Sequence, residues 1–417
     1  MYFLYDLLMI LVAGAVRISA LFSKKMQLFV RGRKNVILEI RAVVRPSDRV
    51  LWFHAASLGE YEQGLPVMEA MRKDFPKHKI VLSFFSPSGF EVRKNNTVAD
   101  VTVYLPLDRR AYVRQFLAAV HPERAFFIKY EFWPNYLLEL RKHSIPTYLI
   151  SGIFRPDQIF FKSYGGFFRR SLSAFTHFFV QNESSASLLS ALGFYNITIS
   201  GDTRFDRVAA IATRDNTLDF MEQFAAGHPV IVAGSTWPKD EELLLRVMAE
   251  NSETVKWVIA PHNVKPDEIA ALAAKAGSGV VLFSKRMDAD LALARILIID
   301  TVGILTKVYS YAAMAYVGGG FGNPGVHNVL EPAVFGVPVL SGPNISHFAE
   351  AVALEQEGGL VTLHDERGIS EFIRKWIGDE EERRRIGDIC REFVNVRRYA
   401  TQRIMEQLHR DVTRNKE

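Results

Sequence analysis

Cysteine is almost absent from this chain of 417 residues, in which Cys390 is the single example. One thiol excludes an internal disulfide and a cysteine-rich zinc site, and it indicates a reducing compartment. Glycine and proline are modest, at 27 and 17 residues, which excludes a collagen-like or low-complexity chain. Because 48% of the residues are hydrophobic and 23% are charged, a wholly disordered protein is excluded as well.

Several motifs that identify cofactor and metal sites are also missing. The sequence has no GxxxxGK[ST] phosphate loop, and Asn323 and Pro324 break the dinucleotide pattern of the glycine-rich stretch 318–325. HExxH, CxxC and EF-hand patterns do not occur. Asp288 and Asp290 form a DxD, but they lie in a polar stretch that we interpret as a solvated loop. We therefore expect neither a metal nor a cofactor.

The positive charge is concentrated near the N-terminus, although a net charge of +5 is too small to indicate a nucleic-acid partner. Residues 1–22 are apolar and long enough to cross a bilayer, but Asp6 and Arg17 fall on one helical stripe. Basic residues follow this stretch instead of preceding it, which distinguishes it from a cleaved secretory signal. We expect 1–34 to attach the protein to the anionic cytoplasmic face of a membrane. A single membrane span and a buried core helix are the alternatives.

From Val50 onward, apolar runs alternate with amphipathic stretches, which is typical of βαβ units. The pattern predicts a helix at 60–75 and two series of strands. The first series is expected at 50–55, 79–85, 125–129, 148–151 and 178–181. The second is expected at 230–234, 257–260, 296–300, 314–320, 337–342 and 360–362.

Strands that are apolar on both faces predict parallel sheets covered by helices, and hence an α/β chain with two Rossmann-like domains facing across a cleft. Ligands in such sheets bind beyond the carboxyl ends of the strands. We expect a first domain at 35–212, a linker at 213–228, a second domain at 229–378, and a C-terminal helix within 379–417 that packs back on the first domain.

The first expected strand leads into Ser57-x-Gly59-Glu60. Ser57 and Glu60 have the spacing of a helix capping box, and spacing alone favours that structural role. The functional interpretation is a carboxylate aimed at a substrate hydroxyl, with Gly59 allowing a substrate to approach the backbone.

The second domain offers similar choices. Ser235 and Thr236 open a helix, where free backbone N–H groups either bind an anion or are capped by Thr236. His262 follows a strand and is either a ligand contact or structural. Asn328 and Glu331 fit a helix cap or a pair that binds the two hydroxyls of a ribose. The glycines at 318–325 form a phosphate or sugar nest, or an irregular connection.

Taken in order, the motifs resemble those of one family. HAASLGE, KYEFWPN (129–135), SGDTRFD (200–206), AGSTWPKDEE, APH, DTVG (300–303) and GGGFGNPGVHNVLEPAVFGVPVLSGP are similar to the 3-deoxy-D-manno-octulosonic acid (Kdo) transferases over Val50 to Gly359. The resemblance implies a GT-B fold without a metal. It further implies transfer of Kdo from CMP-Kdo to the lipid A precursor in lipopolysaccharide biosynthesis, at the cytoplasmic face of the inner membrane of the cell envelope.

The resemblance also implies roles for particular residues, with inversion at the anomeric centre and Glu60 as the general base. Residues on the acceptor side of the cleft would be Ser57, Gly59, Glu131 and Arg155. Donor-binding residues would be Arg204, Ser235, Thr236, His262, Gly303, Asn328 and Glu331. Tyr130 and Arg204 depart from the Thr and Lys that many members have, and His262 lies in an altered context.

Two other functions remain open at this stage. A GT-B transferase with a UDP-sugar donor would need a second phosphate-binding site. A non-catalytic binding protein at the membrane would tolerate loss of Glu60. A nucleic-acid partner is the least favoured, since no recognition motif accompanies the charge.

Overall fold

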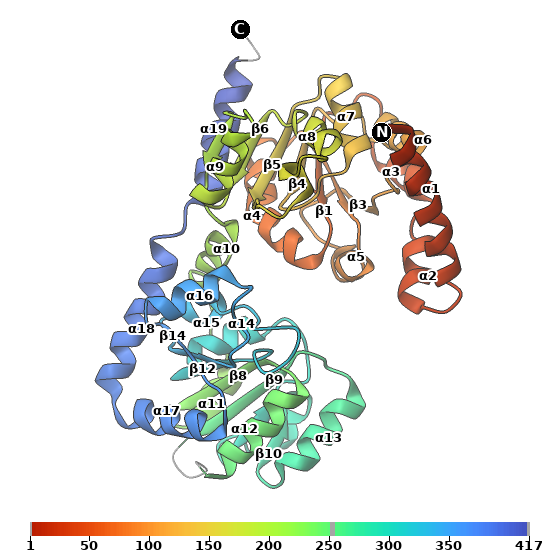
Figure 1. Ribbon diagram of the computed structural model, residues 1–417. Coiled ribbons are helices and arrows are strands. Elements are labelled where there is room, and N and C mark those ends of the chain that lie inside the picture. Colours follow the sequence, from red (N-terminus) through yellow and green to blue (C-terminus); the bar gives the residue numbers. More distant parts are fainter. Residues whose placement is uncertain (1, 251–254, 415–417) are drawn as a thin grey trace. The chain divides into compact units, whose positions relative to one another are not determined.

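The computed structural model describes residues 2–250 and 255–414, and the chain divides into two compact units (Figure 1). Unit 1 comprises Met1–Arg207 and Arg398–Glu417, and unit 2 comprises Val208–Arg397. Each unit is built on its own seven-stranded parallel sheet, so the expected pair of parallel-sheet α/β domains is confirmed.

The sheet of unit 1 has the order β3-β2-β1-β4-β5-β6-β7. The order reverses between β1 and β4, which are neighbours at the centre of the sheet, and Phe53 of β1 pairs there with Phe126. Every residue of β1 is buried, as expected for a strand covered on both faces. The strands are β1 (Val50–Ala55), β2 (Lys79–Phe84), β3 (Val101–Tyr104), β4 (Arg124–Ile128), β5 (Thr147–Gly152), β6 (His177–Val180) and β7 (Ile197–Ile199).

Helices cover both faces of this sheet, and alternate residues of β1 reach opposite cores. Trp52 packs with Ile40 and Phe116 on one face, whereas Phe53 packs with Met68 and Ile404 on the other. The helices are α1 (Tyr2–Ser19), α2 (Lys24–Arg31), α3 (Val36–Val43), α4 (Leu58–Asp74), α5 (Pro87–Arg93), α6 (Arg110–Val120), α7 (Pro134–Lys142), α8 (Gly166–Leu172), α9 (Glu183–Ala191), α10 (Thr203–Ala212, which runs into unit 2) and α19 (Ala400–Arg414).

The sheet of unit 2 has the order β10-β11-β9-β8-β12-β13-β14, with β8 and β12 paired at its centre. Its strands are β8 (Val230–Thr236), β9 (Lys256–Pro261), β10 (Val280–Leu282), β11 (Ile296–Ile298), β12 (Met314–Val317), β13 (Val339–Ser341) and β14 (Leu360–Thr362). Its helices are α11 (Asp219–Ala225), α12 (Pro238–Glu250), α13 (Pro266–Ala276), α14 (Leu305–Val308), α15 (Leu330–Ala333), α16 (Ala349–Gln356), α17 (Glu366–Gly378) and α18 (Glu380–Asn395).

Helix α1 packs on unit 1 through one narrow face. Met9 and Ala13 join a small buried cluster with Phe29 and Leu107, and the Tyr5 hydroxyl donates to Asp108 at 2.8 Å. The rest of the helix surface carries exposed apolar side chains, namely Leu4, Leu7, Leu8, Ile10, Leu11, Val12 and Ile18. Within the described ranges, no helix has the length and hydropathy that a membrane crossing requires.

Two expected elements differ in the structure. The stretch expected to be a linker contains α11, whose Met221 and Phe224 are fully buried in a core of unit 2. The single long helix expected near the C-terminus is two helices: α18 belongs to unit 2, where Phe393 is buried, and only α19 belongs to unit 1. Helices α11 and α18 both bury apolar side chains against residues that are distant in sequence. The local sequence pattern therefore could not assign these helices to unit 2.

Candidate active site

Two carboxylates lie at the central reversal point of the unit 1 sheet. Glu60 is in the first turn of α4, which follows β1, and Glu131 is in the loop that follows β4. Because β1 and β4 are parallel neighbours, their carboxyl ends meet at one edge, where open α/β sheets bind ligands. Both side chains are largely buried, at 9% exposure for Glu60 and 8% for Glu131.

Burial is the main cause that raises the pKa of Glu60, to about 7, and the nearby charge of Glu131 adds to it. Backbone N–H groups of Ala56 and Ser57 donate to the Glu60 carboxylate and act in the opposite direction, as does the charge of Lys129. The Ser57 side chain makes no capping hydrogen bond. Half of a capping box is therefore formed, and Glu60 still titrates in the range that suits a general base.

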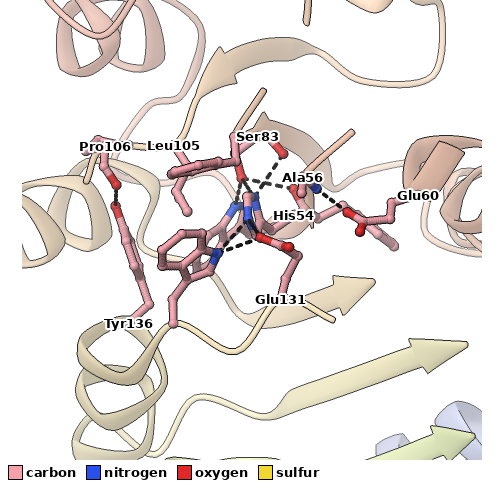
Figure 2. A network of polar contacts seen from close by, with 12 residues as sticks. His54, Ala56, Glu60, Ser83, Leu105, Pro106, Glu131 and Tyr136 are labelled. Carbon is pink, nitrogen blue, oxygen red and sulfur yellow. Dashed lines mark hydrogen bonds and ion pairs between the residues drawn. The ribbon is translucent and has the colours of Figure 1, made fainter. Parts of the chain in front are cut away.

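Glu131 is held by a buried hydrogen-bond network (Figure 2). Its Oε2 accepts from Trp133 Nε1 at 2.7 Å and lies 3.0 Å from His54 Nε2, while His54 Nδ1 lies 2.9 Å from Ser83 Oγ. Trp52 Nε1 donates to the same Ser83 oxygen at 2.8 Å, and the Ser83 hydroxyl donates to the Phe53 carbonyl oxygen at 3.3 Å. The contacts with Trp133 and His54 therefore fix the orientation of the Glu131 side chain.

Cationic side chains surround Tyr130, which precedes Glu131 in the loop that follows β4. Arg155 donates to the Tyr130 hydroxyl at 3.3 Å, and the Lys129 ammonium lies 5.0 Å from the centre of its ring. Lys129 has a left-handed backbone with φ of 65°, which turns the chain sharply after β4. Arg204 follows β7 and forms two contacts with Asp202 Oδ2, at 2.8 and 2.7 Å. Positive charge therefore collects beside the two carboxylates.

In unit 2, the glycine-rich stretch packs against the end of β8 at the central reversal point of that sheet. A Cβ on Gly318 would lie 2.5 Å from the backbone oxygen of Ser235, so no larger residue fits. Asp240 is fully buried and accepts from Gly319 N at 2.8 Å and from the Tyr316 hydroxyl at 2.7 Å. This carboxylate fastens the glycine-rich stretch to α12.

Three aromatic rings stack beside this stretch, and only His262 was expected there from the sequence. The Trp237 ring lies 4.8 Å from His262, His262 lies 4.5 Å from His327, and Trp237 Nε1 donates to His327 Nε2 at 2.9 Å. Burial and the proximity of His262 lower the pKa of His327 to about 4, and burial lowers the pKa of His262. Both imidazole rings of the stack are therefore uncharged near pH 7.

Asn328 and Glu331 lie together at the start of α15. Asn328 Nδ2 donates to Glu331 at 3.0 Å, Thr306 Oγ1 donates to the other carboxylate oxygen at 3.1 Å, and Asn328 Oδ1 accepts from Leu330 N. Gly303 has φ of 97° and open space around its Cα, and the Thr236 hydroxyl donates to Glu241 at 3.0 Å. Thr236 thus uses its hydroxyl proton on Glu241. Asn328 pairs with Glu331, and the N-cap residue of α15 is Val329.

The structure thus gathers the expected residues in two groups, one in each unit. Ser57, Gly59, Glu60, Glu131, Arg155 and Arg204 belong to unit 1, whereas Ser235, Thr236, His262, Gly303, Asn328 and Glu331 belong to unit 2. In the ranges that the structure describes, no group of three or more His, Cys, Asp and Glu residues could hold a metal ion, and Asp288 and Asp290 are exposed.

Comparison with known proteins bears on the identity of this chain. Residues 30–207 match the family model described as 3-deoxy-D-manno-octulosonic-acid transferase (kdotransferase). The 3-deoxy-D-manno-octulosonic acid transferase of Chlamydophila psittaci is 28% identical over 98% of this chain and 96% of its own length. The Haemophilus influenzae enzyme of the same name is 25% identical over 89% of each chain. The resemblance to the Kdo transferases is therefore confirmed.

The chain is thus similar to the Kdo transferases over nearly its whole length. Among solved structures, UDP-GlcNAc 2-epimerase from Neisseria meningitidis covers 87% of the chain with a TM-score of 0.61 at 15% identity, which shows a shared GT-B-like fold only. The family match includes β1, β4 and the carboxylates that follow them. His54, Trp133, Trp237 and His327 were missed from the sequence, although all four lie inside the motifs that carry the resemblance.

Proposed function

We propose that this chain is an inverting transferase that moves Kdo from CMP-Kdo to the lipid A precursor, lipid IVA, with Glu60 as the general base. The observation that carries the proposal is the position of Glu60 at the central reversal point of its sheet, with its pKa raised to about 7. A carboxylate of this kind is ionised in part at neutral pH and is more basic than an ordinary glutamate.

In this mechanism Glu60 accepts the proton of the attacking acceptor hydroxyl. A bond forms between the acceptor oxygen and the anomeric carbon of Kdo, and the bond from that carbon to the phosphate oxygen breaks on the opposite side. The electron pair leaves with CMP. Burial, and second the like charge of Glu131, which His54 and Trp133 orient, keep Glu60 basic.

Unit 2 would bind the donor. Asn328 and Glu331 would hold the ribose hydroxyls, and backbone N–H groups near Gly303 and Ser235 would stabilise the charge that the leaving phosphate gains. Arg204 and Arg155 are the cations expected to assist, because guanidinium groups suit phosphate and carboxylate oxygens. No metal takes part in this scheme, so a chelator should leave the rate unchanged.

The acceptor is a lipid, so the proposal places the protein at the cytoplasmic face of the inner membrane. The exposed apolar face of α1 and the basic residues that follow it support this placement. Apolar burial contributes about 25 cal/mol per Å², and basic residues close to anionic lipid add about 1 kcal/mol each.

The test is incubation of the purified chain with CMP-Kdo and lipid IVA, followed by mass spectrometry of the lipid product. Glu60→Gln should reduce the rate at least about 100-fold, the low end of general-base contributions. Glu62→Gln is the matched control, since that carboxylate lies in the same helix and pairs with Arg93 and Arg207. Equal rates in the wild type and Glu60→Gln would show that Glu60 is not the base and that it has only a structural role at the start of α4.

A further inference from the structure

A pocket of about 500 Å³ lies among helices α1, α2, α3 and α6 of unit 1 and the loop that follows β3, apart from the residues assigned to transfer. Its apolar walls include Val16 of α1, Ile37 of α3 and Leu107, which follows the edge strand β3. The volume falls in the range of about 300–1,000 Å³ that is usual for small-ligand sites. The pocket is therefore large enough for a ligand and is mainly lined by hydrocarbon.

The polar lining of the pocket is strongly biased toward positive charge. Arg17, Arg33 and Lys34 line it, and no acidic side chain does. Arg17 and Lys34 are exposed, whereas Arg33 is partly buried. An apolar pocket with this charge fits an amphiphile that has a hydrocarbon chain and an anionic head.

Arg33 shows this bias most clearly. Its guanidinium donates to the carbonyl oxygens of Leu105 and Phe29, each at 2.8 Å, and of Phe85 at 2.6 Å, and its carbon lies 3.5 Å from the centre of the Phe29 ring. In the described part of the chain, no carboxylate forms an ion pair with it. Burial lowers the pKa of Arg33 to about 9, so it remains charged near neutral pH. Three carbonyls use three of its five N–H groups and supply no compensating charge.

The position of the pocket indicates where such an amphiphile comes from. Val16 and Arg17 lie on α1, whose remaining surface exposes apolar side chains to the surroundings. We propose that the pocket holds one acyl chain of an anionic membrane phospholipid, with the phosphate beside Arg33 and Lys34. The lipid would hold α1 and α2 against the rest of unit 1 from the membrane side. This inference does not depend on Kdo transfer.

The size of the pocket favours a phospholipid over the multi-chain acceptor as the occupant. Its volume suits a single chain, and a phospholipid can leave its second chain in the bilayer. The phosphate would supply the negative partner that Arg33 lacks. Hydrogen bonds between guanidinium and phosphate groups are among the strongest in proteins.

Native mass spectrometry of the full-length chain in a nonionic detergent tests the proposal. The probes are myristoyl lysophosphatidylglycerol, monomyristin and glycerol phosphate, which carry chain and phosphate, chain alone, and phosphate alone. We expect one lysophosphatidylglycerol per chain, bound at least about tenfold more tightly than monomyristin, which corresponds to one charged hydrogen bond. Glycerol phosphate should not compete.

Variants of α1 and its neighbourhood separate a pocket from general insertion into detergent. Val16→Trp should fill the pocket and abolish specific binding, whereas Ile18→Trp, at a position 62% exposed on another face of α1, should bind as the wild type does. Lys34→Gln should reduce the preference for the anionic lipid, and Lys25→Gln, outside the pocket, should not. Circular dichroism establishes that each variant is folded.

Four results would overturn the proposal. Val16→Trp could bind as well as the wild type, or both tryptophan variants could lose binding equally. Glycerol phosphate could compete with the lipid, which would indicate a site for free phosphate. Lipid IVA could displace the probe at a lower concentration than phosphatidylglycerol does, which would assign the pocket to the acceptor substrate. The transfer assay with Glu60→Gln is unaffected by any of these outcomes.

Discussion

Replacing Glu131 by Gln should move the pH dependence of transfer toward acid. The pKa of Glu60 is raised from 4.5 to about 7, first by burial and second by the charge of Glu131. The whole rise corresponds to about 3 kcal/mol at 1.36 kcal/mol per unit. Glutamine removes the charge and keeps a side-chain oxygen that can accept from Trp133 and His54. Burial of Glu60 persists, so its pKa should fall without reaching 4.5.

The magnitude can be worked through for a base that must be ionised. With a pKa of about 7, only about one tenth of Glu60 is ionised at pH 6, and most of it is ionised at pH 8. A decrease of about one unit, or about 1.4 kcal/mol, raises the ionised fraction at pH 6 to about one half. The ratio of the rate at pH 6 to the rate at pH 8 should therefore increase about fivefold.

The assay is kcat/KM for lipid IVA and CMP-Kdo between pH 5 and pH 9, since this parameter reports groups of the free enzyme. The ratio between two pH values is independent of any loss of absolute activity in the variant. If the acid side of the kcat/KM profile of Glu131→Gln stays in place, or moves to higher pH, the coupling between the two carboxylates is refuted. Unfolding offers a second readout. The raised pKa of Glu60 favours the folded state at low pH, and this contribution is lost as the pH rises through about 7. That loss should be absent in Glu60→Gln.

Three further predictions concern the donor site and the membrane. Glu331→Ala should weaken CMP binding by roughly 1.5–3 kcal/mol in calorimetry, the range for hydrogen bonds to a charged group, and unchanged affinity would leave Glu331 a structural residue. Gly318→Ala places a Cβ 2.5 Å from a backbone oxygen and should lower the free energy of unfolding by about 1–3 kcal/mol, whereas Gly378→Ala, with open space around it, should not. Leu8→Glu with Leu11→Glu should prevent flotation with anionic vesicles, because burying each leucine is worth about 1.5–3 kcal/mol, and should leave the melting temperature unchanged, since both are exposed.

The central strands of both sheets were predictable from the sequence, and the strands it missed have a physical explanation. Continuous apolar runs such as VLWFHA mark strands that are buried on both faces. The three missed strands, β3, β7 and β10, each lie at an edge of a sheet. They are short and partly exposed, so neither a long apolar run nor strict alternation distinguishes them from loops.

For the candidate site, the sequence identified residues that follow strands but not the partners that hold them. Glu60 could be placed at a strand end because parallel strands end at one edge, whereas Glu131 was identified only through the resemblance of KYEFWPN to the family. The contact between Glu131 and His54 joins side chains 77 positions apart, and the contact between Trp237 and His327 joins side chains 90 positions apart. Local patterns carry no information about such pairs, and a buried histidine is usually structural.

The hydrogen bond between Tyr5 and Asp108 has a consequence for the order of events during synthesis. Its two side chains are 103 positions apart, and Phe167, which packs against Tyr5 at 5.4 Å, comes later still. At about 5–20 residues per second, roughly 5–20 s separate the appearance of α1 from that of Asp108. During this interval the ribosome carries an apolar helix whose docking surface does not yet exist. The Tyr5 side chain of α1 therefore lacks its packing partners until at least 103 further residues have been made.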